Sequence, residues 1–244
     1  MRRHCNSLSK IPKAACDIDS CSDLAYTPKK PLPAKSFCMY IVGSPGSGKT
    51  NLWQSLLLSK DPKYYNKFFD LVHLISGSLA TLPKKVTKAL PDERKSNQFS
   101  DELLTEIVET LRSGPNTNNL LILDDVIKDL KRSKILSKVF LNRRHCTHDE
   151  GQDKHGGLSI MVTSQKYTLL PLEQRTACSH AILFKSANRQ EIDRIREEIM
   201  FDLEPAQQDA LLKEAWKEPY SFLFIAINAP RDRKYFIKFD RVEI

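Results

Sequence analysis

The chain has 244 residues, 28% of them charged, and a formal net charge of +8. That length suits one large α/β domain or at most two small ones, and the positive charge favours a polyanionic partner such as nucleic acid. No apolar run approaches the roughly 18 to 20 residues of a membrane span. Arg2 and Arg3 are not followed by the apolar stretch of a secretory signal. We therefore expect a soluble, intracellular protein.

Neither the cysteines nor the N-terminal residues show regular spacing. Six cysteines lack CxxC pairs or regular spacing, which is typical of free thiols in a reducing compartment. Residues 1–35 hold seven Lys or Arg and three Asp, lack apolar periodicity and end in a proline-containing stretch. They are expected to form a basic tail or linker, with one domain over residues 36–244.

A glycine-rich motif follows the first apolar run of that domain. Residues 37–42 have the composition of a strand, residues 51–58 suit a helix, and between them residues 43–50 read GSPGSGKT. This is the pattern G-x-x-x-x-G-K-[ST], whose backbone N–H groups wrap a polyphosphate. Lys49 is expected to reach the β- and γ-phosphates and Thr50 to ligate Mg²⁺. The residues expected to bind ATP are Gly43, Ser44, Pro45, Gly46, Ser47, Gly48, Lys49 and Thr50.

Downstream, strand-like runs alternate with helical stretches, which predicts a mainly parallel sheet covered by helices. The expected strands are residues 68–75, 120–125, 158–165, 180–184, 222–227 and 235–239. Helices are expected at residues 101–112, 127–145, 189–200 and 205–217, and an irregular stretch at 76–100. With the phosphate loop, this predicts an α/β three-layer sandwich of the RecA/ASCE-like P-loop NTPase class.

Two carboxylates end the apolar run at residues 120–123, as in a Walker B motif. Asp124 is expected to hold Mg²⁺, and Asp125 to orient and deprotonate the attacking water. Because a glutamate is the commoner base in such ATPases, Asp125 has a shorter reach. Gln165 ends the next expected strand. If that strand lies between the P-loop strand and the Walker B strand, Gln165 can face the γ-phosphate and position water.

Phosphoryl transfer also gains from an arginine that neutralises charge on the γ-phosphate, often donated by a neighbouring subunit. Four arginines lie near the ends of expected strands, and the sequence does not choose among them. They are Arg143, Arg144, Arg175 and Arg189.

Two further clusters of polar residues suggest binding sites, but an ordinary solvated surface explains each of them as well. A basic stripe at helical spacing could face DNA phosphates; it comprises Lys128, Lys131, Lys134 and Lys138. A second cluster suggests zinc, but its spacing matches no defined site, and a polar insertion explains it adequately. Its members are His145, Cys146, His148, Asp149, Glu150, Asp153 and His155.

Eight motifs follow one another along the chain: GSPGSGKT, FFDLVHLISG, LLILDD, NRRH, VTSQ, RTACSHAILF, LLKEAW and YSFLFI. Tyr167 lies shortly after the fifth of them. This order resembles that of the genome-packaging ATPases of poxviruses, other large eukaryotic DNA viruses and virophages, within the FtsK-HerA superfamily. The resemblance runs from about residue 36 to residue 239.

The resemblance implies roles for further residues. Gln165 matches the sensor, and Arg144 or Arg175 matches a finger acting on a neighbouring subunit. An insertion at residues 147–157 departs from the pattern and leaves the position of Arg144 open.

It also implies an ATPase that moves double-stranded DNA into a preformed capsid as a ring of five or six subunits, with ATP and Mg²⁺ as cofactors. Capsid proteins would be its partners, and the host cytoplasm, with the virion, its location. Two alternatives remain at this stage. One is a nucleotide-gated capsid-assembly protein, and the other, less favoured, is a small P-loop kinase.

Overall fold

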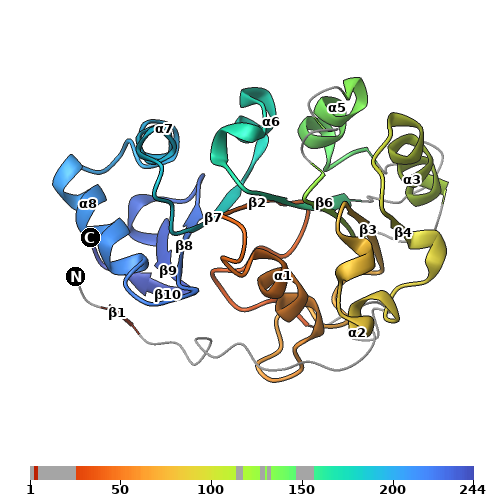
Figure 1. Cartoon of the computed structure of the whole chain (residues 1–244), viewed down its shortest axis with the longest axis horizontal. Helices are drawn as coiled ribbons and strands as arrows, with labels where there is room; N and C mark the ends of the chain where they lie inside the picture. The colour runs from red at the N-terminus through yellow and green to blue at the C-terminus, as the bar shows by residue number, and fades with distance from the viewer. Residues whose placement is uncertain (1–2, 5–25, 114–117, 127–129, 131–132, 147–156) are drawn as a thin grey trace.

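A computed structural model of the chain describes residues 3–4, 26–113, 118–126, 130, 133–146 and 157–244. Within these residues, ten strands form a single sheet in the order β1-β10-β9-β8-β7-β2-β6-β5-β3-β4 (Figure 1). The strands are β1 (Arg3–His4), β2 (Cys38–Val42), β3 (Leu71–Ser76), β4 (Lys95–Ser96), β5 (Asn118–Asp124), β6 (Gly157–Ser164), β7 (His180–Phe184), β8 (Phe222–Ala226), β9 (Tyr235–Ile237) and β10 (Asp240–Val242).

The sheet has a parallel part and an antiparallel part. Strands β4, β3, β5, β6, β2 and β7 pair in parallel, while β8, β9, β10 and β1 continue the sheet with antiparallel pairing. Strand β6 therefore lies between β2, which precedes the phosphate loop, and β5, which ends in the two aspartates. This is the placement on which the expected role of Gln165 depends.

Helices cover both faces of the sheet. Figure 1 shows α3, α5, α6 and α7 above the sheet, α1 and α2 below it, and α8 at the end formed by β8–β10. Their bounds are α1 (Lys49–Leu58), α2 (Lys84–Thr87), α3 (Asp101–Ser113), α5 (Lys134–Asn142), α6 (Leu172–Ala177), α7 (Arg189–Ile199) and α8 (Pro205–Ala215). The expected three-layer α/β sandwich with a mainly parallel sheet is confirmed.

Side chains alternate between two apolar cores along the strands. In β2, Tyr40 joins the core under α3, α5 and α7, whereas Met39 and Ile41 join the core under α1. Every residue of β2 and β5 is buried, as expected for central strands covered on both faces. The sheet therefore holds the carboxyl ends of β2, β5 and β6 in a fixed relation.

Local signals fix where several helices begin. The side chain of Ser133 accepts the Leu136 N–H before α5, and Asn188 accepts the Glu191 N–H before α7. Such caps satisfy N–H groups that have no partner within the helix. Helix α8 starts with Pro205 after a capping box.

Part of the expected tail packs against the domain. Leu32 is buried, the Tyr26 hydroxyl donates to the carbonyls of Lys63 and Tyr64, and the Tyr65 hydroxyl donates to the Pro33 carbonyl. Residues 26–35 thus contact the α1 side of the domain, while the division of the chain at residue 35 stays a prediction.

Most expected strands and helices are present within a few residues, but some elements were missed. Helix α6 and strand β10 were not expected, nor was strand β1 within the expected tail, and residues 76–100 contain the short elements α2 and β4. Of the helix expected over residues 127–145, α5 covers Lys134–Asn142, and residues 127–129 and 131–132 lie outside the described residues. A helix long and apolar enough to cross a membrane is absent from the described residues.

Candidate active site

The phosphate loop connects β2 to α1, and its glycines are required for two different reasons. Gly46 and Gly48 have φ angles of 76° and 101°, which side-chain-bearing residues rarely adopt. A Cβ on Gly43 would lie 2.5 Å from Ser47 Oγ and 2.7 Å from the Phe184 Cβ. Gly46 and Gly48 are therefore required by the backbone conformation of the loop, and Gly43 is required by the close packing around it.

Lys49 is held by the loop itself. Its side chain is nearly buried, and Nζ donates to the carbonyl oxygens of Gly43 at 2.6 Å and Ser44 at 3.0 Å. Burial lowers the pKa of Lys49, and the negative charges of Asp125 and Asp124 partly oppose that effect. The ammonium thus lies over the loop and faces the two aspartates.

Asp124 is 2% exposed and accepts hydrogen bonds from three different elements. Oδ1 accepts from Trp53 Nε1 of α1 at 3.2 Å and from Thr163 Oγ1 of β6 at 2.8 Å. Oδ2 accepts from Ser76 Oγ of β3 at 3.1 Å. Because each donor belongs to a rigid element, the carboxylate has a fixed position next to the phosphate loop.

Asp125 is exposed and differs from Asp124 in both backbone and contacts. Its φ angle is 55°, a left-handed conformation that costs a non-glycine residue about 1 kcal/mol or more. Its N–H donates to Thr163 Oγ1 at 3.1 Å, and its carboxylate oxygens accept from Gln165 Nε2 at 3.2 and 3.3 Å. One hydroxyl, that of Thr163, therefore orders both aspartates.

The structure thus brings together Lys49, Asp124, Asp125 and Gln165, as the sequence predicts. Sequence reasoning missed Trp53, Ser76 and Thr163, which position Asp124. A signal existed for two of them. Ser76 is in register with Asp124 at the end of the neighbouring strand, and Thr163 precedes Gln165 by two residues, the spacing of one face of a strand.

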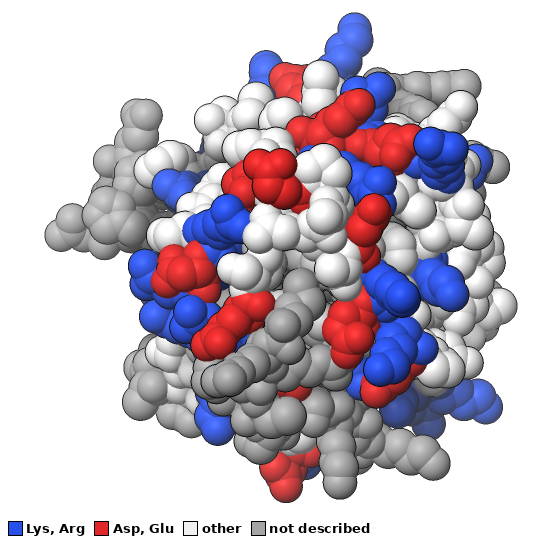
Figure 2. All heavy atoms as spheres, turned by 90° about the vertical axis from the view of Figure 1, so that its left-hand side faces the viewer, with Lys and Arg blue, Asp and Glu red and all other residues white. Residues whose placement is uncertain are grey.

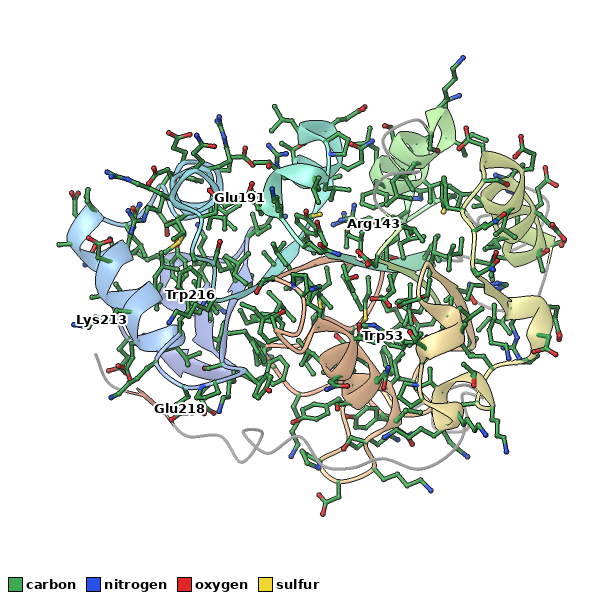
Figure 3. The ribbon with its side chains drawn as sticks, in the orientation of Figure 1. Trp53, Arg143, Glu191, Lys213, Trp216 and Glu218 are labelled. Atoms are coloured by element: carbon green, nitrogen blue, oxygen red, sulfur yellow. The ribbon has the colours of Figure 1, made fainter. Side chains whose placement is uncertain are left out.

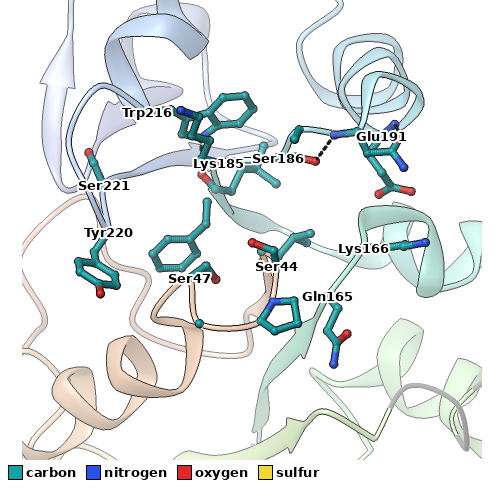
Figure 4. Close-up of a pocket in the computed structure, with 18 of the residues that line it drawn as sticks. Ser44, Ser47, Gln165, Lys166, Lys185, Ser186, Glu191, Trp216, Tyr220 and Ser221 are labelled. Atoms are coloured by element: carbon teal, nitrogen blue, oxygen red, sulfur yellow. Dashed lines mark hydrogen bonds between the residues drawn. The ribbon is translucent and has the colours of Figure 1, made fainter.

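A cavity of about 720 Å³ opens beside the loop, between the ends of β2 and β7 and the segment that joins α8 to β8. Its aromatic walls are Phe184, Trp216 and Tyr220. Figure 4 shows Tyr220 and Gln165 on opposite sides of the loop. The site therefore has a carboxylate-bearing side toward β5 and β6 and an aromatic side toward β7 and β8.

Arg143 and Arg144 lie at the other edge of the sheet. Arg143 is buried, and it donates from Nε to the Ser36 carbonyl and from Nη1 to the Phe140 carbonyl, both at 2.8 Å (Figure 3). Ser36 precedes β2, so this edge is opposite the phosphate loop. Arg144 is exposed next to it and therefore lies away from the phosphate loop of its own chain.

Arg175 is engaged within its own subunit. Its guanidinium donates to both carboxylate oxygens of Glu198, at 2.9 and 2.7 Å, and to the Leu170 carbonyl at 2.6 Å, and it lies over the Tyr167 ring. Burial raises the pKa of Glu198, but hydrogen bonds from Arg175 and Tyr167 lower it overall. A finger role for Arg175 would require breaking this pair, whereas Arg189 is exposed at the start of α7.

The other sequence clusters fall largely outside the described residues. Lys128 and Lys131 lie outside them, as do His148, Asp149, Glu150, Asp153 and His155. Lys134 and Lys138 are exposed on α5. Within the described part of the chain, His, Cys, Asp and Glu side chains form no group of three or more that could hold a metal.

Solved structures share this fold at low sequence identity. The genome packaging NTPase B204 of Sulfolobus turreted icosahedral virus 2, in complex with AMP, matches with a TM-score of 0.59 and 13% identity over 87% of this chain and 100% of that chain. B204 of Sulfolobus turreted icosahedral virus, described as a DNA-packaging ATPase, gives 0.55 and 14% over 87% and 100%. These likenesses confirm the P-loop NTPase class.

A more distant likeness is the pCW3 conjugation coupling protein TcpA with ATPγS, at a TM-score of 0.50 and 11% identity over 85% of this chain and 61% of that chain. Among curated protein sequences, none matches significantly. A sequence profile of the family described as "Poxvirus A32 protein" matches residues 26–211. That range spans well over half of the chain and includes the whole carboxylate-bearing side of the site, so the chain belongs to the Poxvirus A32 protein family.

Proposed function

We propose that the chain is an ATP-hydrolysing motor that translocates viral double-stranded DNA into a preformed capsid. The observation that carries this proposal is the convergence of Lys49, Asp124, Asp125 and Gln165 at one edge of the sheet. Family membership and the B204 structures, described as genome packaging enzymes, support the same function.

The residues of the loop and of β5 fit Mg²⁺ and ATP. The loop supplies backbone N–H groups in left-handed turns at Gly46 and Gly48, as phosphate binding requires. Thr50 and Asp124 supply a hydroxyl and a carboxylate, the oxygen ligands that Mg²⁺ prefers, and we propose that they hold the ion. When bound, Mg²⁺ supplies neutralisation of charge on the β- and γ-phosphate oxygens.

The chain's own residues divide the remaining work. When ATP binds, the Lys49 ammonium leaves the carbonyls of Gly43 and Ser44 and donates to phosphate oxygens instead, so its positive charge lies against the substrate. Asp125 orients the attacking water and accepts its proton at a carboxylate oxygen. Gln165 contacts that carboxylate and so couples the end of β6 to the presence of the γ-phosphate.

A second set of roles requires neighbouring subunits. We propose a homo-oligomeric ring of five or six subunits in which an arginine of one subunit reaches the site of the next. Arg144 is the better candidate because it is exposed, whereas Arg175 is bound to Glu198. Assembly with capsid proteins would take place in the host cytoplasm.

We propose α5, and not α7 or α8, as the helix that faces DNA. Lysine, arginine and carboxylate side chains intermingle at the end of the molecule that carries α7 and α8 (Figure 2). Ion pairs there include Arg194 with Glu197 at 3.1 Å. On α5, Lys134 and Lys138 are exposed, so they are the described members of the basic stripe that we propose to contact DNA phosphates.

The experiment is an ATPase assay with and without double-stranded DNA. Lys49→Ala should reduce kcat by at least about 10³-fold because the substrate phosphates lose their buried cation. The matched control is Lys213→Ala, which removes an exposed lysine of α8 (Figure 3) and should leave activity unchanged.

A clean preparation that shows neither hydrolysis nor DNA binding would exclude the motor. Slow turnover that does not respond to DNA, with nucleotide-dependent binding to a capsid protein, would indicate the assembly role. Phosphate transfer to an acceptor other than water would indicate a kinase.

A further inference from the structure

The polar side of the site fixes the direction in which a bound nucleotide must extend. Asp124, Asp125 and Gln165 all lie toward β5 and β6, where the terminal phosphate and its metal belong. The rest of the nucleotide must then leave the loop on the other side of β2. That side holds the cavity between β7, the start of α7 and the segment that joins α8 to β8.

Tyr220 has the features of a platform at the entrance of this cavity. Its side chain is 71% exposed, and its φ angle is 58°, in the left-handed region that tyrosine rarely adopts. A Cβ on Gly48 would lie 3.4 Å from Tyr220 Cδ1, so the ring lies against the phosphate loop. Tyr220 is therefore an exposed aromatic ring that lies in a left-handed turn and against the phosphate loop.

The walls behind Tyr220 are apolar and held in place. Trp216 Nε1 donates to the Leu183 carbonyl at 3.0 Å, which fixes the indole at the end of α8. Phe184, the last residue of β7, is buried against Phe222. Figure 4 shows Trp216 and Tyr220 bordering the same hollow. A flat ligand can therefore pack against aromatic carbon on more than one side.

Several polar groups of the cavity are engaged within the protein. The Glu191 carboxylate accepts from the N–H and the hydroxyl of Thr168, and Asn188 caps α7. Among the described residues, the buried Ser47 hydroxyl has no hydrogen-bond partner, and it belongs to the loop beside the phosphates. Three exposed lysines also line the cavity and carry their charge on flexible stems; they are Lys166, Lys185 and Lys217. Few rigidly placed groups therefore remain to read the edge of a base.

We infer that this cavity binds the purine base of the nucleotide by stacking on Tyr220, with Trp216 and Phe184 as its apolar walls, and that it discriminates little between adenine and guanine. The inference rests on the proposed function, because it takes a nucleoside triphosphate as the ligand of the loop. Base–aromatic stacking tolerates any base because every base has a π face. Apolar pockets reject near-isosteric ligands weakly, whereas hydrogen-bonding sites reject them strongly.

Binding of three probes by isothermal titration calorimetry tests the pocket: ATP, GTP and inorganic tripolyphosphate, each with Mg²⁺. Tyr220→Ala should weaken ATP and GTP by about 10- to 100-fold, the range of base–aromatic stacking, and leave tripolyphosphate unchanged. Tyr220→Phe keeps the ring and should bind ATP within about threefold of the unaltered protein. Phe201→Ala removes an aromatic side chain of equal exposure elsewhere and should have no effect.

ATP and GTP should bind the unaltered protein within about tenfold of each other, and a larger preference would overturn the lack of discrimination. Tyr220→Gly, which relieves the backbone strain, should lose ATP affinity as Tyr220→Ala does. An unchanged ATP affinity in both variants, or an equal loss for tripolyphosphate, would overturn the base pocket and leave the proposed function intact. If the unaltered protein binds neither ATP nor tripolyphosphate, the proposed function itself fails.

Discussion

The two sides of the phosphate loop are built from different chemistry. Toward β5 and β6, a buried carboxylate is fixed by an indole N–H and two hydroxyls, from α1, β3 and β6. Toward β7 and β8, a cavity is walled by Phe184, Trp216 and Tyr220, and Trp216 Nε1 donates to the Leu183 carbonyl. The polar side can hold a charged group in one geometry, whereas the aromatic side mainly offers ring surfaces for packing. We expect substitutions on the first side to change rate and those on the second to change affinity.

Among the substitutions that compare the two sides, Asp124→Asn is expected to have the largest effect. The amide keeps the shape of the side chain and an oxygen that can accept from Trp53 and Thr163, so the fold should persist. It removes the negative charge that we propose to hold Mg²⁺, and kcat should fall by about 10³-fold. Steady-state ATPase assays and thermal unfolding measure the two effects separately.

The control for Asp124→Asn is Asp232→Asn, which removes an exposed carboxylate and should leave both quantities unchanged. Retention of full activity in Asp124→Asn would show that the buried carboxylate has only a structural role.

Thr163→Val should have a smaller effect because the threonine acts through its neighbours. The methyl group fills the same space but loses the donor to Asp124 at 2.8 Å and the acceptor for the Asp125 N–H at 3.1 Å. Loss of such positioning contacts typically costs about 10- to 100-fold. The loss should fall on kcat, with little change in KM for ATP, because Thr163 is not expected to touch the nucleotide.

Thr163→Ser restores the hydroxyl and should recover most of the lost kcat. A serine variant as slow as the valine variant would show that packing, and not the hydrogen bonds, explains the effect. The same pair of variants leaves the aromatic side untouched, so ATP affinity serves as an internal comparison.

The difference between the two sides also explains what the sequence could reveal. Asp124 and Gln165 stand where apolar strands end in polar residues, and Lys49 completes the phosphate-loop pattern. Their convergence follows from that pattern and from parallel strand order. The position of β6 between β2 and β5 was an assumption that the topology confirmed. Trp53 was hidden because an apolar helix face predicts a core residue, and its N–H contact depends on packing.

The aromatic side gave no such signal. Phe184 ends β7, whereas Trp216 and Tyr220 lie in the segment that joins α8 to β8. Each one alone is indistinguishable from ordinary core or surface. Their proximity depends on the antiparallel pairing of β7 with β8, which places the end of α8 next to the loop. The contact of Arg175 with Glu198 was hidden for the same reason, since it joins α6 to α7.

The smallest predicted effect compares two histidines of the sheet, the buried His73 and the half-buried His180. Burial lowers the pKa of His73 in β3 to about 4, as it does for His180 in β7, with nearby Arg94 and Arg143 adding to the two shifts. Both are therefore neutral in the folded protein and protonated in the unfolded chain between pH 6.5 and 4. Since the unfolded state binds more protons there, stability is fully present above pH 6.5 and decreases as pH falls toward 4.

The surroundings of the two histidines predict different responses to substitution. His73 Nε2 has no partner among the described residues, so His73→Leu should keep stability at pH 7 and lessen the loss at pH 5 by about 1 to 2 kcal/mol. His180 lies 2.9 Å from Ser179 Oγ and against the rings of Phe37 and Phe224, so His180→Leu should lose stability at pH 7 as well. Urea unfolding at pH 7 and pH 5 measures the free energy of unfolding of each variant. An unchanged pH dependence in His73→Leu would show that His73 has the same pKa in the folded and unfolded states.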